Sequence, residues 1–164
     1  MRPAPVLLAA CLPALAAAAP PAIEVTFGEL STFSDLRVSI NTTDRDRQHL
    51  AGELRRHIQR AAPARLPPDT RLAVTITDVD MAGEYPPITG PMSRDLRVVK
   101  DMYPPRIDLA FRLTSAEGQQ LREGRRELHD AGILWGVSPG TRDNLAFEKA
   151  LLDGWLEREF ALPR

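Results

Sequence analysis

The chain has 164 residues and a formal net charge of −1 at pH 7, and 43% of its residues are hydrophobic. This near balance of charge excludes nucleic acid and an anionic membrane surface as its expected main partners, because both select an excess of Lys and Arg. The single cysteine, Cys11, lies in an N-terminal leader. Without that leader the chain has no thiol for catalysis or metal binding, and we expect no cofactor.

The first 19 residues have the features of an export signal. Arg2 supplies a positive charge, and Val6–Ala18 is an apolar run that is too short to span a bilayer. Ala16–Ala18 fits an A-x-A cleavage motif, which predicts a mature N-terminus near Ala19. We therefore expect a signal peptide over residues 1–19, a single domain over residues 20–164, and a periplasmic or secreted protein.

An alternative use of the leader stays open. Leu8–Cys11 resembles a bacterial lipobox, in which the cysteine becomes a lipidated first residue. Only ten residues precede Cys11, and the apolar run continues past it, which favours ordinary cleavage. Lipidation would make the protein an envelope lipoprotein, and only then would we expect it to bind a membrane.

The first half of the mature chain predicts a strand, a helix and a second strand. Ile23–Phe27 alternates apolar and polar residues, as a half-buried strand does. Thr43 and Asp46 resemble a capping box, and helical spacing of apolar residues behind them continues to about Ala61. Leu72–Thr77 is rich in β-branched residues, which predicts a second strand.

The middle of the chain contains the clearest strand pattern. Ile107–Leu113 alternates with a period of two, and Pro104–Pro105 must precede its paired part because proline has no backbone N–H. Ala116–Gly118 supplies a turn, after which Gln120–Asp130 is expected to pair as a hairpin. Leu96–Lys100 predicts a short edge strand, which could also accept a strand from a partner.

The last predicted element is a helix over Asn144–Phe160, capped by Thr141. Its apolar face comprises Leu145, Leu152, Trp155, Leu156 and Phe160. The element order is therefore strand, helix, strand, strand, strand, helix. We predict an α+β fold: a two-layer sandwich with a mostly antiparallel sheet of about four strands and two helices on one face.

Three stretches carry a resemblance to a known family. They are Asp78–Glu84 (DVDMAGE), Asp101–Ile107 (DMYPPRI) and Phe147–Trp155 (FEKALLDGW). With them the chain, from Ile23 to Phe160, resembles an uncharacterised bacterial family, the domain of unknown function 3016. The resemblance implies an exported protein of the cell envelope. It implies no activity, cofactor or catalytic residue.

The sequence favours a non-catalytic binding or accessory module, with another envelope protein as the expected partner. Pro104 and Pro105 stiffen a corner that presents its neighbours in fixed directions. Tyr and Arg are enriched at binding hot spots, and a proline-rich loop follows Tyr85. The predicted binding surface is Tyr85, Asp101, Tyr103, Arg106 and Trp135. In the alternative interpretation Tyr103 packs under the corner, and Arg106 pairs with Asp101 or Asp108.

Two other functions stay open. Asp78, Asp80 and Glu84, with Asp101, suggest a metal site and hence a small metal-dependent hydrolase, although the spacing fails the EF-hand pattern. A hydrophobic ligand between sheet and helices is the other alternative.

Two further patterns do not support catalysis. Gly136–Gly140 matches G-x-S-x-G, but Pro139 lacks the N–H that an oxyanion hole needs. His49, Glu53 and His57 share one helical stripe, for which we expect a solvated rim.

Overall fold

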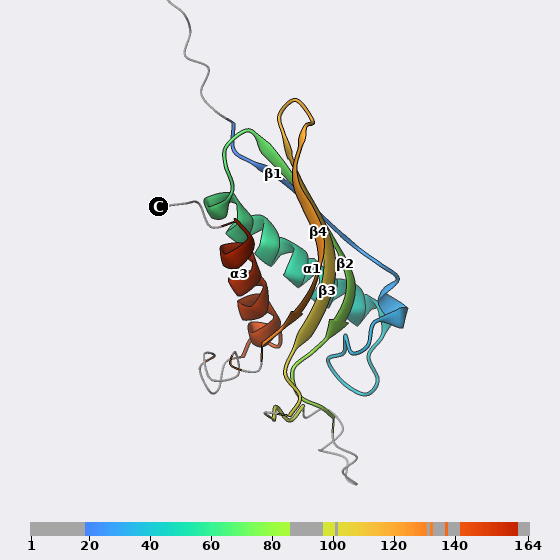
Figure 1. Ribbon diagram of the computed structural model, residues 1–164. Helices are drawn as coiled ribbons and strands as arrows, with labels where there is room; N and C mark the ends of the chain where they lie inside the picture. The colour runs from blue at the N-terminus through green and yellow to red at the C-terminus, as the bar shows by residue number, and fades with distance from the viewer. Residues whose placement is uncertain are drawn as a thin grey trace, which may run out of the picture.

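The structure is a computed structural model that describes residues 19–85, 97–100, 102–130, 132, 137 and 142–160 (Figure 1). Its elements in chain order are β1 (Ala22–Phe27), the short 3-10 helix η1 (Leu30–Thr32), α1 (Asp44–Ala61), the 3-10 helix η2 (Ala62–Arg65), β2 (Thr70–Asp80), β3 (Arg106–Ser115), β4 (Gln120–His129) and α3 (Ala146–Phe160). The predicted α+β class and element order are confirmed. The predicted leader with Cys11, together with Asp101, Trp135, Thr141 and most of Gly136–Gly140, lies outside the described residues.

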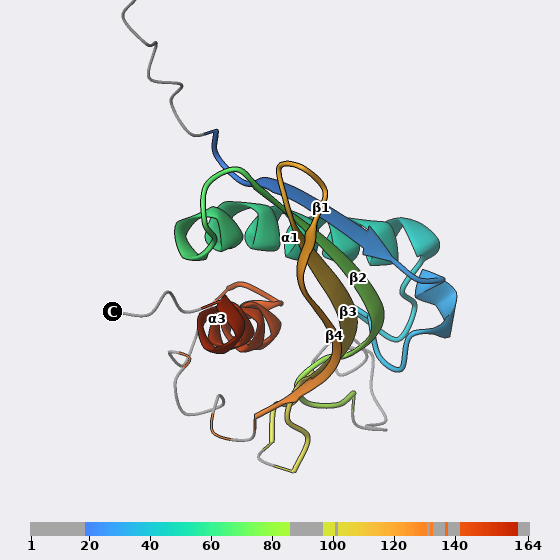
Figure 2. The ribbon, with the colours of Figure 1, turned by 45° about the horizontal axis from the view of Figure 1, so that its top comes forward.

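The strands form one sheet in the order β1-β2-β3-β4. β1 pairs parallel with β2, whereas the other two pairings are antiparallel. Val25, Val74 and Phe111 lie opposite one another across the first three strands. Figures 1 and 2 show both helices over the same face of this twisted sheet, as predicted.

Apolar side chains on the helix-covered face make the core. The alternating residues of β3 that were predicted to share a face, Ile107, Leu109, Phe111 and Leu113, are all buried. Phe111 meets Trp155 and Phe160 of α3 edge to face, with ring centroids 5.7 and 5.5 Å apart. These rings fill the space between β3 and α3, so packing of large apolar side chains holds the helix on the sheet.

The helix ends and contacts follow local chemistry. The Thr43–Asp46 capping box is present: the Asp46 carboxylate accepts from the Thr43 N–H at 2.8 Å, and Thr43 Oγ1 accepts from the Asp46 N–H. α1 ends at Ala61, just before Pro63, and Pro63 lies in the first turn of η2, where its missing N–H costs little. His57 lies 2.9 Å from Asp153, so the predicted rim of α1 faces α3 rather than only solvent.

The end of one predicted strand and one whole predicted element were wrong. The second strand runs to Asp80 instead of ending at Thr77, and its register shifts between Ile76 and Asp78. That irregularity restarts the alternation, so Val79 is buried while Asp78 and Asp80 lie on the uncovered face. The predicted edge strand at Leu96–Lys100 is also wrong for its described part. Val98 pairs only with Glu84, outside the sheet.

The corner before β3 and the turn after it agree with the sequence. Pro104 and Pro105 precede the first paired residue of β3, Arg106, and Gly118 has a φ of +83° in the turn to β4. Within the described ranges, no helix is both long enough and apolar enough to cross a membrane.

Candidate functional site

The chain leaves β2 through Met81, Ala82 and Gly83, which we name the junction segment. Its backbone is held from several distant parts of the chain. The Ala82 N–H donates to Glu148 on α3 at 2.8 Å, and the Gly83 N–H donates to the Tyr103 carbonyl at 2.9 Å. The junction segment therefore connects the end of the sheet to α3 and to the corner before β3.

Arg97 is the main partner of the junction segment. Its Nη1 donates to the carbonyl oxygens of all three junction residues at 3.1–3.3 Å. Its Nη2 donates to Asp35 at 3.0 Å, and its side chain is only 14% exposed. Since a buried guanidinium is costly unless it is paired, this ion pair and these hydrogen bonds fix the position of the segment.

Asp35, Arg37 and Tyr85 extend the same network. Asp35 is buried and accepts from Arg37 Nε at 2.7 Å, while its backbone pairs in parallel with the end of β2. Tyr85 donates its hydroxyl to the Arg37 carbonyl, and its ring centroid lies 4.7 Å from the Arg97 guanidinium. These contacts make Tyr85 part of a fixed polar and cation–π network.

Glu148 is the most buried carboxyl of this region, with 1% of the residue exposed. One oxygen accepts from the Ala82 N–H, whereas Oε2 has no hydrogen-bond partner among the described residues. Burial raises the pKa of Glu148 to about 7, because the ionised form loses its hydration and is only partly compensated. The support of the junction segment therefore includes a group that changes charge near neutral pH.

Two hollows border the junction segment. The first, of about 290 Å³, is lined by Arg37, Tyr85 and Arg97 together with Asn144 and Phe147 near the start of α3. The second, of about 220 Å³, is lined by residues at the ends of β2, β3 and β4 and by the corner: Asp80, Met102, Tyr103, Pro104, Arg106 and His129. Met81 borders both hollows.

Arg106 is held by carboxylates on the uncovered face of the sheet. Its guanidinium bonds Asp78 at 2.8 Å and Asp108 at 3.1 Å. Burial alone would raise the pKa of Asp78, but hydrogen bonds from Ser34 and the Arg106 charge outweigh it, so this pKa lies below its usual value. For Asp108 burial dominates, and its pKa is raised. Arg106 is thus a paired residue at the edge of the second hollow.

Asp80, in the second hollow, differs from its neighbours. Among the described residues, no donor hydrogen-bonds to its carboxylate. Burial raises its pKa, and the nearby Asp35 charge raises it further, while Arg106 opposes the shift. The hollow therefore contains a carboxylate whose charge is poorly compensated.

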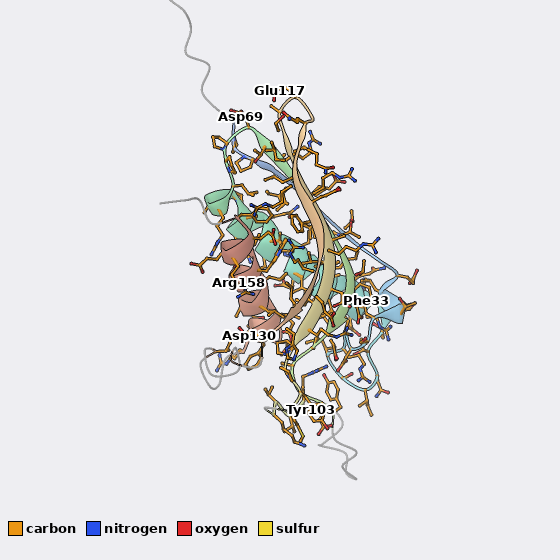
Figure 3. The ribbon with its side chains drawn as sticks, in the orientation of Figure 1. Phe33, Asp69, Tyr103, Glu117, Asp130 and Arg158 are labelled. Carbon is orange, nitrogen blue, oxygen red and sulfur yellow. The ribbon has the colours of Figure 1, made fainter. Side chains whose placement is uncertain are left out.

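Three exposed apolar residues border the two hollows: Val99 lines the first, and Met102 and Tyr103 line the second. Val99, Met102 and Tyr103 are 42%, 70% and 41% exposed. They account for most of the large hydrophobic residues that are exposed in the described part of the chain; the others are Ile40 and Leu121. Figure 3 shows Tyr103 at the end of the molecule opposite Glu117 in the β3–β4 turn. We name Val99, Met102 and Tyr103 the apolar corner.

The structure divides the predicted binding surface. Tyr103 and Arg106 line the second hollow, and Tyr85 lines the first. Arg106 was expected either to bind a partner or to pair with an aspartate of the chain. Its ion pair with Asp108 is present, and Arg106 also lines the second hollow. The predicted role of these residues in binding stays a prediction.

Two residues of the suggested metal site have partners of their own. Asp78 pairs with Arg106, and Glu84 pairs with Lys100 at 2.6 Å. In the described ranges, no three His, Cys, Asp or Glu side chains are placed to hold a metal ion together. The metal-dependent hydrolase stays a prediction without a ligand set in this part of the chain.

Sequence reasoning missed Asp35, Arg97 and Glu148, which organise the site. Asp35 and Arg97 are 62 residues apart, and neither lies in a motif that suggests an ion pair. Glu148 did carry a signal: it shares a helical stripe with the buried residues Leu152 and Trp155, where a carboxyl must find a buried donor.

Comparison with known proteins supports the family assignment. A family model described as "Protein of unknown function (DUF3016)" matches residues 21–158, which confirms the predicted resemblance. No curated protein and no solved structure matches the chain.

Proposed function

The chain belongs to the DUF3016 family, whose function is unknown, and from the site we propose that it is a non-catalytic binding module of the cell envelope. Its docking surface is the apolar corner together with the second hollow. The partner is another envelope protein, which the export signal predicted over residues 1–19 would place in the same compartment.

The apolar corner is the observation that carries this proposal. Val99, Met102 and Tyr103 lie within five positions of one another, and their exposure leaves apolar surface in water. Apolar side chains that gather on a surface beside polar groups mark interaction sites, whereas single exposed ones are ordinary. Met and Tyr are also among the residue types enriched at interfaces.

Backbone hydrogen bonds and prolines hold the apolar corner in one conformation, which favours binding. The Tyr103 carbonyl accepts from the Gly83 N–H, and the Tyr103 N–H donates to the Lys100 carbonyl at 3.0 Å. Lys100 in turn pairs with Glu84, and the two prolines that follow Tyr103 restrict the backbone. A surface that is already ordered loses less conformational entropy when a partner binds.

Photo-crosslinking in intact cells tests the proposal. A photoreactive amino acid replaces Met102 in one variant and Leu121 in another. Leu121 is the matched control, because it is also an exposed large hydrophobic residue, 50% exposed, but lies near the β3–β4 turn. We expect a discrete crosslinked protein band from position 102 and none from position 121.

The contrast between the two positions decides the result. A band from position 102 that disappears when Tyr103 is also changed to Ser assigns the contact to the corner. Equal bands from both positions, or none from position 102 in cells that export the protein, would overturn the proposal.

A further inference from the structure

We propose that the segment bound at the apolar corner is basic, and that it places an Arg or Lys side chain in the second hollow against Asp80. This inference rests on the proposed function and names the chemistry of the partner. The charges around the hollow, the unpaired carboxylate and the apolar walls each support it.

Among the described residues around the two hollows, carboxylates outnumber guanidinium and ammonium groups. Arg37 and Arg97 are both engaged with Asp35. Arg106 is shared between Asp78 and Asp108, and a third carboxylate, that of Glu127, lies 3.8 Å from it. Lys100, the nearest lysine of the corner, is paired with Glu84. Asp80 is left over after these pairings, so this surface has excess negative charge that favours a cationic partner.

The Asp80 carboxylate is placed to receive that cation. It lines the hollow, is half-buried, and accepts no hydrogen bond from the described residues. Burial and the nearby Asp35 charge raise its pKa, so its ionised form is less favourable here than in water. A guanidinium or ammonium group from a partner would supply the charge and the donors that Asp80 lacks, in a charge-assisted hydrogen bond.

The walls of the hollow suit the rest of such a side chain. Arg and Lys bury an aliphatic stem along apolar surface while the charged group reaches a polar site. Met102, Tyr103 and Pro104 provide that apolar wall. An anionic or purely apolar segment would leave Asp80 unpaired beside it, at a cost in desolvation.

A peptide titration followed by NMR tests the inference on the mature chain. The probe is a synthetic peptide of alternating leucine and arginine, and its matched control has glutamine in place of each arginine. The backbone amide shifts of Met102, Tyr103 and His129 are followed at pH 7.5. We expect saturable shifts with the arginine peptide and at least about tenfold weaker binding of the glutamine peptide.

Two variants locate the effect. Asp80→Asn keeps the shape of the side chain and removes its charge, and we expect it to weaken binding of the arginine peptide at least about fivefold. Glu24→Gln removes an exposed carboxylate on β1, outside the hollow, and is expected to leave binding unchanged. Both variants are first checked for wild-type melting temperature and amide spectra.

The outcomes separate this inference from the proposed function. Equal binding of the two peptides, or binding of the arginine peptide that Asp80→Asn does not change, overturns the basic partner. The crosslink from position 102 would still stand in that case, and the module would bind a partner of another charge. Loss of that crosslink overturns the proposed function itself.

Discussion

Two glycines at opposite ends of the sheet have nearly the same backbone conformation and very different surroundings. Gly118, in the β3–β4 turn, has a φ of +83°, and Gly83, in the junction segment, has a φ of +82°. A Cβ added at Gly118 would have no heavy atom within 4 Å. At Gly83 the same Cβ would lie 2.5 Å from the Val98 carbonyl oxygen.

The different surroundings of Gly118 and Gly83 show which contacts determine the structure at each end of the sheet. At the turn, a positive φ closes a hairpin between neighbouring strands, and local sequence is enough to require glycine. At the junction, glycine also permits a close approach by residues 98 and 99, which are distant in sequence. The turn end is specified by local pattern, whereas the site end is specified by long-range polar contacts.

Arg97→Ala gives the largest expected loss and tests those long-range contacts. The substitution removes one of the two guanidiniums that pair with Asp35, and it leaves three junction carbonyls without their Arg97 donor in a largely buried setting. We expect a loss of about 3–5 kcal/mol in the free energy of unfolding, measured by urea denaturation. Chemical shifts should change at the apolar corner as well.

Arg112→Ala is the matched control on the sheet. Its side chain is 63% exposed and meets Glu123 at 3.4 Å in solvent. We expect a change within about 0.5 kcal/mol. If the two variants lost similar stability, Arg97 would not be the anchor of the junction segment.

Glu148→Gln is the next largest expected effect, and it depends on pH. The pKa of Glu148 is about 7 in the folded protein, above its ordinary value of 4.5. The stabilisation from its protonated form is therefore full below pH 4.5 and is lost as pH rises to about 7. Glutamine is never ionised. The free energy of unfolding of the variant, relative to that of wild type, should therefore rise by an amount on the order of 3 kcal/mol between pH 4.5 and 8.

The measured quantity is the difference in unfolding free energy between Glu148→Gln and wild type, at pH 5 and at pH 8. Taking this difference cancels the contributions of the other carboxyls to the pH dependence of stability. One of these is Asp78, whose pKa is lowered and which therefore favours folding at higher pH. A difference that stayed constant across this range would contradict the raised pKa of Glu148.

The fold was largely predictable because its signals are periodic and local. The alternation of Ile107–Leu113, the capping box at Thr43 and the apolar face around Trp155 each predicted an element that the structure contains. The register shift after Ile76 was not predictable from alternation, since it depends on pairing with β3.

The site was predicted only in part, and the reason is physical. Tyr103 and Arg106 were named because proline stiffness and residue type are visible in the sequence. The network around Asp35 and Arg97 was missed because its partners are far apart along the chain and meet only after the sheet forms. The sequence suggested Asp78 and Asp80 together as possible metal ligands. In the structure Asp78 instead pairs with Arg106, a partner 28 residues away that the sequence pattern does not show.

The two glycines themselves give the smallest expected effect and the most direct comparison. Alanine in the left-handed region costs roughly 1–2 kcal/mol, so Gly118→Ala should lose about 1 kcal/mol, because its Cβ has open space. Gly83→Ala bears the same backbone cost plus an overlap with backbone atoms, which cannot move as a side chain can. We expect it to lose at least about 1 kcal/mol more in urea unfolding. It should also shift the Val98 and Tyr103 amides, because relief of the overlap must move those segments apart. Equal losses at both positions would mean that the junction is held as loosely as the turn, and the corner could not then be the rigid surface that the proposed binding requires.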